Sequence, residues 1–348
     1  MLDLLIAVLA LAAPVHMGHV VSGQKAVVLE TEQRDGYVCE LVEYKVSRNE
    51  KVKAYLLVPD GAGKKDRRAG LVLLHDHGAR FDIGKEKLVK PLASAEENIK
   101  LSAEEWSLSG FDGVFFGDEL AKKGFVVLVP DVLYWGSRST PECQKWSRVK
   151  FCGEEGNLSE LKNTVYEGQR AVYDSLYAKG EIWAEKTLRE DATAVEILKR
   201  LPCVDKKRIG AFGWSMGAHR CWLLAAFCKD VKTGVALCWM TLKETCDNPP
   251  KASDFSMLIP EFRDNYDFPD IARWLAPKPF FFLNGDKDKL FPLAQSKQAF
   301  DTMQGIYRGK NAEGLLRTEF FDGPHHCGTR EQSIIADYLS SVLCQPLP

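Results

Sequence analysis

The chain of 348 residues lacks an excess of charge of one sign, because 46 Lys and Arg stand against 48 Asp and Glu, a net charge of −2. This balance excludes the strongly basic surface that nucleic-acid binding requires and the charge blocks of a disordered tail. Internal repeats and low-complexity tracts are also absent, which argues against a solenoid or propeller. We therefore expect a small molecule or a neutral polymer as partner, and no nucleic acid.

A long membrane-spanning run is missing as well. The apolar segment Leu4–Ala13 is too short to span a bilayer as a helix but has the length of a signal-peptide core. Ala10-Leu11-Ala12 offers a small-residue cleavage site, whereas Asp3 and the absence of Lys or Arg before the run are atypical. We expect residues 1–23 to be a signal peptide and leader, and the protein to be secreted or periplasmic. If the run is instead a buried N-terminal helix, the protein is cytoplasmic.

No Cys-x-x-Cys pair occurs among the ten cysteines, which argues against a zinc ribbon or a thioredoxin-type site. Cys143 and Cys152 lie in a segment that reads as a loop and are close enough for a candidate local disulfide. Cys221, Cys228 and Cys238 sit in apolar patterns and are expected to be buried thiols.

The pattern of apolar residues predicts the fold class. An alternating segment, Val38–Val46, turns into Lys51–Val58, which indicates an antiparallel hairpin. Short apolar strands then alternate with helical patterns up to Thr329–Leu343. This order predicts an α/β fold, with a mostly parallel central sheet covered by helices on both faces. We expect one domain, 24–348. Three of its segments do not fit the alternation of strands and helices and are expected to be insertions over the site: 84–117, 134–180 and 247–273.

One short motif organises the chain. Gly213-Trp214-Ser215-Met216-Gly217 follows an apolar strand and precedes a helical pattern, the context of a nucleophile elbow. Glycines two positions before and after the serine permit the strained turn. Ser215 is therefore the expected nucleophile, with the N–H of Met216 facing a developing oxyanion at the helix N-terminus. The alternative is a glycine-rich strand–helix turn without chemistry.

A serine nucleophile needs a base and a carboxylate that orients it. Asp286 and Asp288 follow the strand near Phe280–Leu283, and the histidine pair His325-His326 follows the next strand. Both pairs lie past the C-terminal ends of strands, where open α/β sheets bind ligands. We expect Asp288 as the acid and His325 as the base, with His326 as the alternative base and Asp286 as a turn-capping residue.

The second oxyanion donor is expected in the loop that follows the first parallel strand. His77-Gly78-Ala79 lies there, and the N–H of Ala79 is the candidate donor. The nearby His75-Asp76-His77 also resembles a metal-binding pair, but no further ligands follow at the spacing that a metal site needs. We predict no metal and no cofactor, and a bracing role for His75.

At this point the residues resemble the α/β-hydrolase superfamily, and within it the branch of dienelactone hydrolases and acetyl xylan esterases. The motifs that carry the resemblance are His77-Gly78-Ala79, Gly213–Gly217, Gly285–Asp288 with Phe291-Pro292, Gly323–Cys327, the lead-in Val204–Gly210, and Asp131 with Gly136-Ser137-Arg138. Dienelactone hydrolases proper use a cysteine nucleophile, and many members have glycine where Ala218 stands. The resemblance therefore implies the fold and the triad more than one activity.

The resemblance implies a serine esterase with an α/β-hydrolase fold that acts on a small-molecule or glycan ester, such as an acetylated plant polysaccharide or oligosaccharide. A serine peptidase of the same fold and a catalytically silent binding protein are the alternatives. Trp135 and Trp214 are candidate substrate contacts. The insertion tryptophans Trp106, Trp135, Trp146 and Trp274 could form a platform for sugar rings, although such residues more often form local core. The sequence leaves the acyl group, the alcohol and the oligomeric state open.

Overall fold

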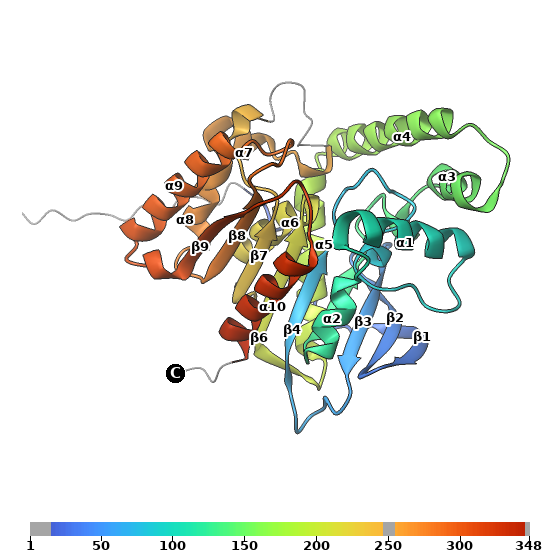
Figure 1. Ribbon diagram of the computed structural model, residues 1–348, viewed down its shortest axis with the longest axis horizontal. Helices are drawn as coiled ribbons and strands as arrows, with labels where there is room; N and C mark the ends of the chain where they lie inside the picture. Colours follow the sequence, from blue (N-terminus) through green and yellow to red (C-terminus); the bar gives the residue numbers. More distant parts are fainter. Residues whose placement is uncertain (1–14, 246–254, 345–348) are drawn as a thin grey trace, which may run out of the picture.

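The computed structural model describes residues 15–245 and 255–344, so the expected signal-peptide run Leu4–Ala13 lies outside the described residues. Nine strands of the described part form one sheet in the order β1-β2-β3-β5-β4-β6-β7-β8-β9 (Figure 1). The strands are β1 (Val27–Arg34), β2 (Tyr37–Lys45), β3 (Lys51–Pro59), β4 (Arg68–Leu74), β5 (Val126–Pro130), β6 (Val204–Trp214), β7 (Thr233–Leu237), β8 (Phe280–Gly285) and β9 (Leu316–Phe321).

One edge of the sheet is antiparallel. The predicted hairpin is confirmed as β2 and β3, which pair from Tyr37 with Pro59 to Lys45 with Lys51. The sequence pattern missed the edge strand β1, which pairs with β2 through an irregularity after Val28. Val27, Val28 and Leu29 are all exposed, so β1 lacks the alternation of a half-buried strand.

The rest of the sheet, from β5 and β4 to β9, is parallel, as the alternation of strands and helices predicted. Its inner strands β5, β7 and β8 are buried on both faces, whereas the edge strand β9 is mostly half-buried. In β4, for example, Leu71 and Leu73 pack into one layer, while Val72 and Leu74 pack into the other. The carboxyl ends of all these strands therefore meet at one edge of the sheet, which positions the loops that follow them.

Helices cover both faces of the sheet. The layer that contains Val72 is closed by α5, α6, α8 and α9, and the opposite layer by α1, α2 and α10. The main-layer and insertion helices are α1 (Glu97–Phe111), α2 (Phe116–Lys122), α3 (Pro141–Cys152), α4 (Leu158–Ala178), α5 (Trp183–Arg200), α6 (Met216–Phe227), α7 (Pro260–Asn265), α8 (Ala272–Leu275), α9 (Leu293–Gly309) and α10 (Thr329–Leu343). The last helix has the bounds that the sequence predicted.

The three irregular segments contribute helices at one end of the sheet. Segment 84–117 contains the short helix η1 (Lys85–Lys87) and α1, and segment 134–180 contains η2 (Gly136–Arg138), α3 and α4. The described part of the third segment contains α7. Figure 1 shows α1, α3, α4 and α7 gathered at the upper end of the sheet.

The candidate disulfide between Cys143 and Cys152 was wrong. Both residues are free thiols at opposite ends of α3. Nine helical steps separate them by about 13 Å along the axis, far beyond the span of a disulfide. The expected buried thiols Cys221, Cys228 and Cys238 are confirmed as buried.

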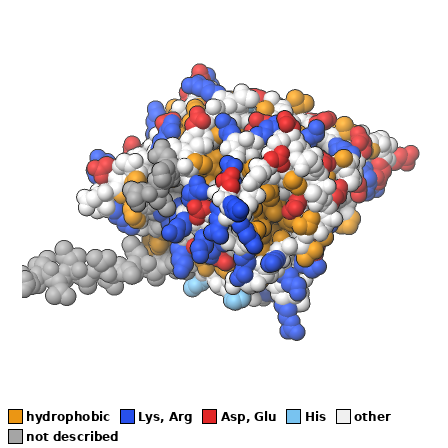
Figure 2. All heavy atoms as spheres, turned by 90° about the horizontal axis from the view of Figure 1, so that it is seen from below, with side chains coloured by type: hydrophobic (Ala, Val, Ile, Leu, Met, Phe, Trp, Pro, Cys, Tyr) orange, Lys and Arg blue, Asp and Glu red, His pale blue; other side chains and the backbone are white. Residues whose placement is uncertain are grey.

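The surface shows no dominant sign of charge. Figure 2 shows basic and acidic side chains interspersed on the face seen from below, with hydrophobic groups between them, in keeping with the small net charge. No helix in the described ranges combines the length and apolar character needed to cross a bilayer.

Candidate active site

Ser215 lies at the turn between β6 and α6, with φ of 56° and ψ of −124°, a strained conformation for a residue that carries a side chain. A Cβ atom on Gly213 would collide with the carbonyl of Gly217, and one on Gly217 with the carbonyl of Leu74. Ser215 is partly exposed, whereas every other residue from 211 to 220 is buried. The strand, turn and helix thus present a single polar side chain at the edge of the sheet.

Asp288 and His325 meet from two neighbouring strand ends. Nδ1 of His325 lies 2.7 Å from Oδ2 of Asp288, and the carboxylate is shielded from solvent. The other oxygen of Asp288 accepts hydrogen bonds from the N–H groups of Leu290 (2.8 Å) and Phe291 (3.3 Å). A carboxylate at Nδ1 holds the proton on that nitrogen and leaves Nε2 to act as a base.

The two alternative residues have other partners. Asp286 accepts a hydrogen bond from the N–H of Gly323 at 3.0 Å, which ties the loop after β8 to the loop after β9. Nε2 of His326 lies 3.3 Å from a carboxylate oxygen of Asp112, at the end of α1. The structure therefore brings Asp288 and His325 together, and it places Asp286 and His326 in bracing contacts.

Aromatic rings hold the imidazole of His325. The ring of Trp214 lies 5.4 Å away between centroids and the ring of Phe291 lies 5.8 Å away, with interplanar angles of 33° and 23°. Trp214, expected as a substrate contact, is buried and serves as packing for the base. Trp135 is also fully buried, and its Nε1 donates to the carbonyl of His77 at 3.1 Å. Neither ring presents a face to solvent, and a role of either as a substrate contact stays a prediction.

The two expected oxyanion donors, the N–H groups of Met216 and Ala79, differ in whether they already have a hydrogen-bond acceptor. Met216 occupies the first position of α6, where a backbone N–H has no partner within the helix, and no group in the described part of the chain accepts from it. The N–H of Ala79, a residue with φ of 51°, donates to Nδ1 of His77 at 3.0 Å. The Ala79 donor must exchange this partner before it can bind an oxyanion.

Buried groups brace the loop that carries Ala79. His75 contacts the carbonyl of Asp76 through Nδ1 (3.0 Å) and accepts from the N–H of Val132 through Nε2 (3.3 Å). Burial holds the pKa of His75 well below its ordinary value, so its ring is neutral. Both ring nitrogens are occupied by backbone groups, which supports the predicted bracing role over a metal ligand.

The same loop receives a buried lysine from the first insertion. Nζ of Lys87 donates to the carbonyls of Asp76 (2.8 Å) and His77 (2.7 Å). Burial lowers the pKa of Lys87 to about 8. Lys87 was missed from the sequence, because it stands in the charged run Lys85-Glu86-Lys87, where nothing marks one lysine as buried.

The loop that carries His325 is clamped by α1, also from the first insertion. The carbonyl of Gly110 accepts from the N–H of Cys327 at 3.0 Å, and Asp112 accepts from the N–H of Thr329 at 2.8 Å. Gly110 also lies under the ring of Trp214, where a Cβ atom would approach to 2.9 Å. The insertion therefore supports both the base and the ring beside it.

One group of metal-ligating atoms occurs in the described ranges. Sγ of Cys238 and atoms of Asp288 and His325 lie within 4.8 Å of one another. Burial raises the pKa of the Cys238 thiol, which keeps it protonated, and the other two members already bond each other. This group is best described as an acid–base pair packed against a buried thiol.

A mostly parallel sheet with Ser, Asp and His after β6, β8 and β9 defines an α/β hydrolase. The family model of the dienelactone hydrolase family matches residues 109–254, a stretch that contains Ser215 and ends before Asp288 and His325. This match confirms the resemblance inferred from the motifs, and the fold is that of the α/β hydrolases.

Known proteins of similar sequence and structure agree with this family. The chain is 22% identical over 292 residues to YtaP of Bacillus subtilis (strain 168), provisionally named a hydrolase, with 83% of each chain covered. Among solved structures, a provisionally named acetyl xylan esterase from Bacteroides fragilis has a TM-score of 0.63 at 18% identity, covering 86% of this chain and 70% of that one. A glucuronoyl esterase from Solibacter usitatus has a TM-score of 0.61 at 12% identity, with 94% and 89% covered. At these identities the structural matches establish the fold.

Proposed function

We propose that the protein is a serine esterase that hydrolyses a carboxylic ester through an acyl-enzyme, and that it removes acetyl groups from a plant-type polysaccharide or oligosaccharide. The observation that carries the proposal is the 2.7 Å contact between His325 and a buried Asp288, beside a serine on a strained elbow. The esterase names of structurally similar proteins support the ester and glycan part of the proposal.

The proposed reaction begins when Nε2 of His325 takes the proton of Ser215 as Oγ attacks the ester carbonyl. Asp288 holds the imidazole in this tautomer and stabilises the imidazolium that forms. The tetrahedral oxyanion receives hydrogen bonds from the N–H groups of Met216 and Ala79, the latter released from His77.

The intermediate collapses when His325 gives its proton to the alcohol that leaves. Water then attacks the acyl group on Ser215, with His325 again as the base, and acetate departs. Because the rings of Trp214 and Phe291 pack against the imidazole, we propose that the same nitrogen serves both steps without reorientation.

The direct test is hydrolysis of an aryl acetate by the wild type and by Ser215→Ala, followed by release of acetate from acetylated xylo-oligosaccharides. We expect turnover of both substrates by the wild type and none by the variant. Turnover by Ser215→Ala would remove the nucleophile assignment. Turnover of aryl acetate without acetate release from any acetylated glycan would keep the esterase and contradict the glycan substrate.

We further propose that residues 1–23 direct export, on the strength of the apolar run and the cleavage site in the sequence. Expression of the full chain in a bacterial host, followed by mass measurement of the protein in each compartment, tests this. We expect a shortened chain outside the cytoplasm. A full-length chain confined to the cytoplasm would contradict export.

A further inference from the structure

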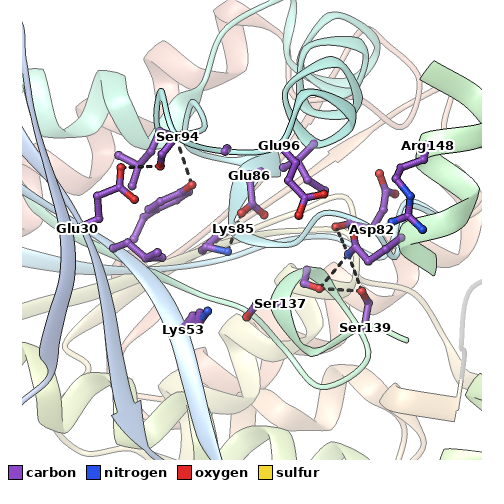
Figure 3. Close-up of a pocket in the computed structure, with 17 residues that line it drawn as sticks. Glu30, Lys53, Asp82, Lys85, Glu86, Ser94, Glu96, Ser137, Ser139 and Arg148 are labelled. Carbon is purple, nitrogen blue, oxygen red and sulfur yellow. Dashed lines mark hydrogen bonds and ion pairs between the residues drawn. The ribbon is translucent and has the colours of Figure 1, made fainter. Parts of the chain in front are cut away.

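A cavity of about 440 Å³ lies between the antiparallel edge of the sheet and the first two insertions (Figure 3). Its walls come from β1, β2 and β3, from the segment around η1, from the start of α1, and from η2 and α3. The volume falls within the range of small-molecule sites, roughly 300–1,000 Å³. The residues of the proposed triad do not line it.

Fixed ion pairs build one wall of the cavity. Nζ of Lys85 lies 2.6 Å from a carboxylate oxygen of Glu86 and 2.9 Å from Oδ2 of Asp131. Asp131 also accepts from the N–H and the hydroxyl of Ser137 at 2.9 and 2.7 Å. Gly136 sits so close to this carboxylate that a Cβ atom would clash with it. The wall is therefore preorganised, which lowers the cost of binding a ligand.

Three charged side chains on the walls have bonding capacity left. In the described part of the chain, the side chains of Lys53 and Glu96 make no hydrogen bond or ion pair. Arg148 donates through Nε to Glu154 at 2.6 Å, and its two terminal nitrogens have no acceptor among the described residues. Figure 3 shows Lys53 and Arg148 on different sides of the cavity.

These groups point to the chemistry of a ligand. An ammonium or guanidinium group only donates hydrogen bonds, and a carboxylate only accepts them. Three basic and four acidic side chains line the cavity, so its lining favours neither an anion nor a cation. A neutral ligand that satisfies Lys53, Arg148 and Glu96 together must both accept and donate, as hydroxyl groups do. Leu92 and Ile99 offer apolar surface for the C–H faces of a ring.

The cavity and the proposed active site share one edge of the sheet. Lys53 and Tyr55 flank Ala54, which pairs with Pro130 at the C-terminal end of β5, and Ser215 follows the C-terminal end of β6. Strand β4 lies between β5 and β6, and the loop after it carries Ala79. Asp82 lines this cavity and also a smaller one that reaches Ala79.

We propose that this cavity is a second carbohydrate-binding site, which holds a neutral sugar unit of the substrate chain away from the unit that carries the ester. The inference rests on the proposed function for the identity of the substrate, but binding at the cavity does not require the triad. It can therefore be measured in a protein that cannot turn over.

The test is calorimetric titration of the full-length Ser215→Ala protein with xylotriose and cellotriose. We expect at least one neutral trisaccharide to bind, and we expect K53M and E96Q, each added to Ser215→Ala, to weaken that binding about tenfold, the cost of one charge-assisted hydrogen bond. K51M is the matched control, because Lys51 lies on the same strand outside the cavity and pairs with Glu43. Thermal unfolding of each variant verifies the fold.

Failure of both trisaccharides to bind would overturn the proposal, as would binding that K53M and E96Q leave unchanged. Displacement of the sugar by inorganic phosphate would assign the cavity to an anion instead and would also overturn it. These results are separate from the aryl acetate assay, which alone decides whether the protein is an esterase.

Discussion

The loops after β6, β8 and β9 and the insertion 84–117 both shape the candidate active site, but they contribute different things. The three loops carry the proposed nucleophile Ser215, its base His325, and Asp288, which orients that base. The insertion carries no reacting group. Its residue Lys87 nevertheless holds the loop that carries Ala79, and its residue Asp112 holds the loop of His325. Substitution of a triad residue should therefore lower the rate by orders of magnitude more than substitution of a residue that only holds a loop in place.

The largest effect is expected for Ser215→Ala. Loss of the nucleophile should lower kcat by about 10⁶-fold while leaving the fold intact, because a hydroxyl is replaced by hydrogen at a partly exposed position. Steady-state hydrolysis of aryl acetate, with circular dichroism as the fold control, checks this. A loss below tenfold would place the nucleophile elsewhere.

The two adjacent histidines give the sharpest form of the comparison. His325→Ala should cost about as much as Ser215→Ala, because the base and the nucleophile act as a unit. His326→Ala should cost about tenfold or less, because His326 bonds to Asp112 at 3.3 Å and serves to hold the loop. The same assay measures both variants. Equal losses, or the larger loss at His326, would reverse the assignment.

The two aspartates are expected to differ in the same way. Asp288→Asn keeps the size of the side chain but offers no carboxylate to His325, and should lower kcat by about 10⁴-fold. Asp286→Asn is the matched control, since Asp286 contacts the backbone of Gly323 and not the imidazole. Comparable losses in the two variants would show that the carboxylate acts only through loop structure.

A smaller effect is expected where α1 clamps the histidine loop. Asp112→Ala removes the acceptor for His326 and for the N–H of Thr329. Because the side chains of His326 and Asp112 are both partly exposed, the loss in free energy of unfolding should be about 1 kcal/mol. Denaturant unfolding measures it, with Glu104→Ala on the exposed face of the same helix as the control. An Asp112→Ala protein as stable as the control would contradict the role of Asp112 in holding the loop of His325.

The last effect depends on pH and concerns Lys87, whose pKa is about 8 in the folded protein against about 10.4 in an unfolded chain. Between these values the unfolded chain binds more protons, so the free energy of unfolding should rise with pH. Relative to Lys87→Met, the wild type should gain at most about 1.4 kcal/mol per pH unit in this window. Urea unfolding of both proteins at pH 7, 8 and 9.5 measures this difference. A difference that stays constant or falls would contradict the burial of a charged Lys87.

The parts of the fold that depend on short stretches of sequence could be predicted from the sequence. The hairpin, the buried strands and helix Thr329–Leu343 follow from alternation and helical periodicity within short windows. The elbow was predictable because Gly213 and Gly217 are required by backbone geometry that the motif itself encodes. His325 was preferred as the base with the adjacent His326 left as the alternative, and the structure supplies a physical reason for that choice, which is the contact of His325 with Asp288.

Contacts between segments far apart in the chain could not be predicted from the sequence. Asp112 and Thr329 are 217 residues apart, and no periodicity links them. Trp214 was a candidate substrate contact, but its ring is buried and Gly110 of α1 lies against it. The cavity lined by Lys53 and Glu96 is formed by three segments that are each unremarkable alone. Such features depend on how insertions pack against the sheet, which composition and spacing do not encode.

The central claim is that Ser215 is activated by His325 and Asp288. The most direct measurement is labelling of the full-length protein with a fluorophosphonate, followed by mass mapping of the modified peptide. We predict one phosphonylated residue, Ser215, in the wild type and in His326→Ala, and none in Ser215→Ala or His325→Ala. A label on another residue, or no label on the folded wild type, would contradict it.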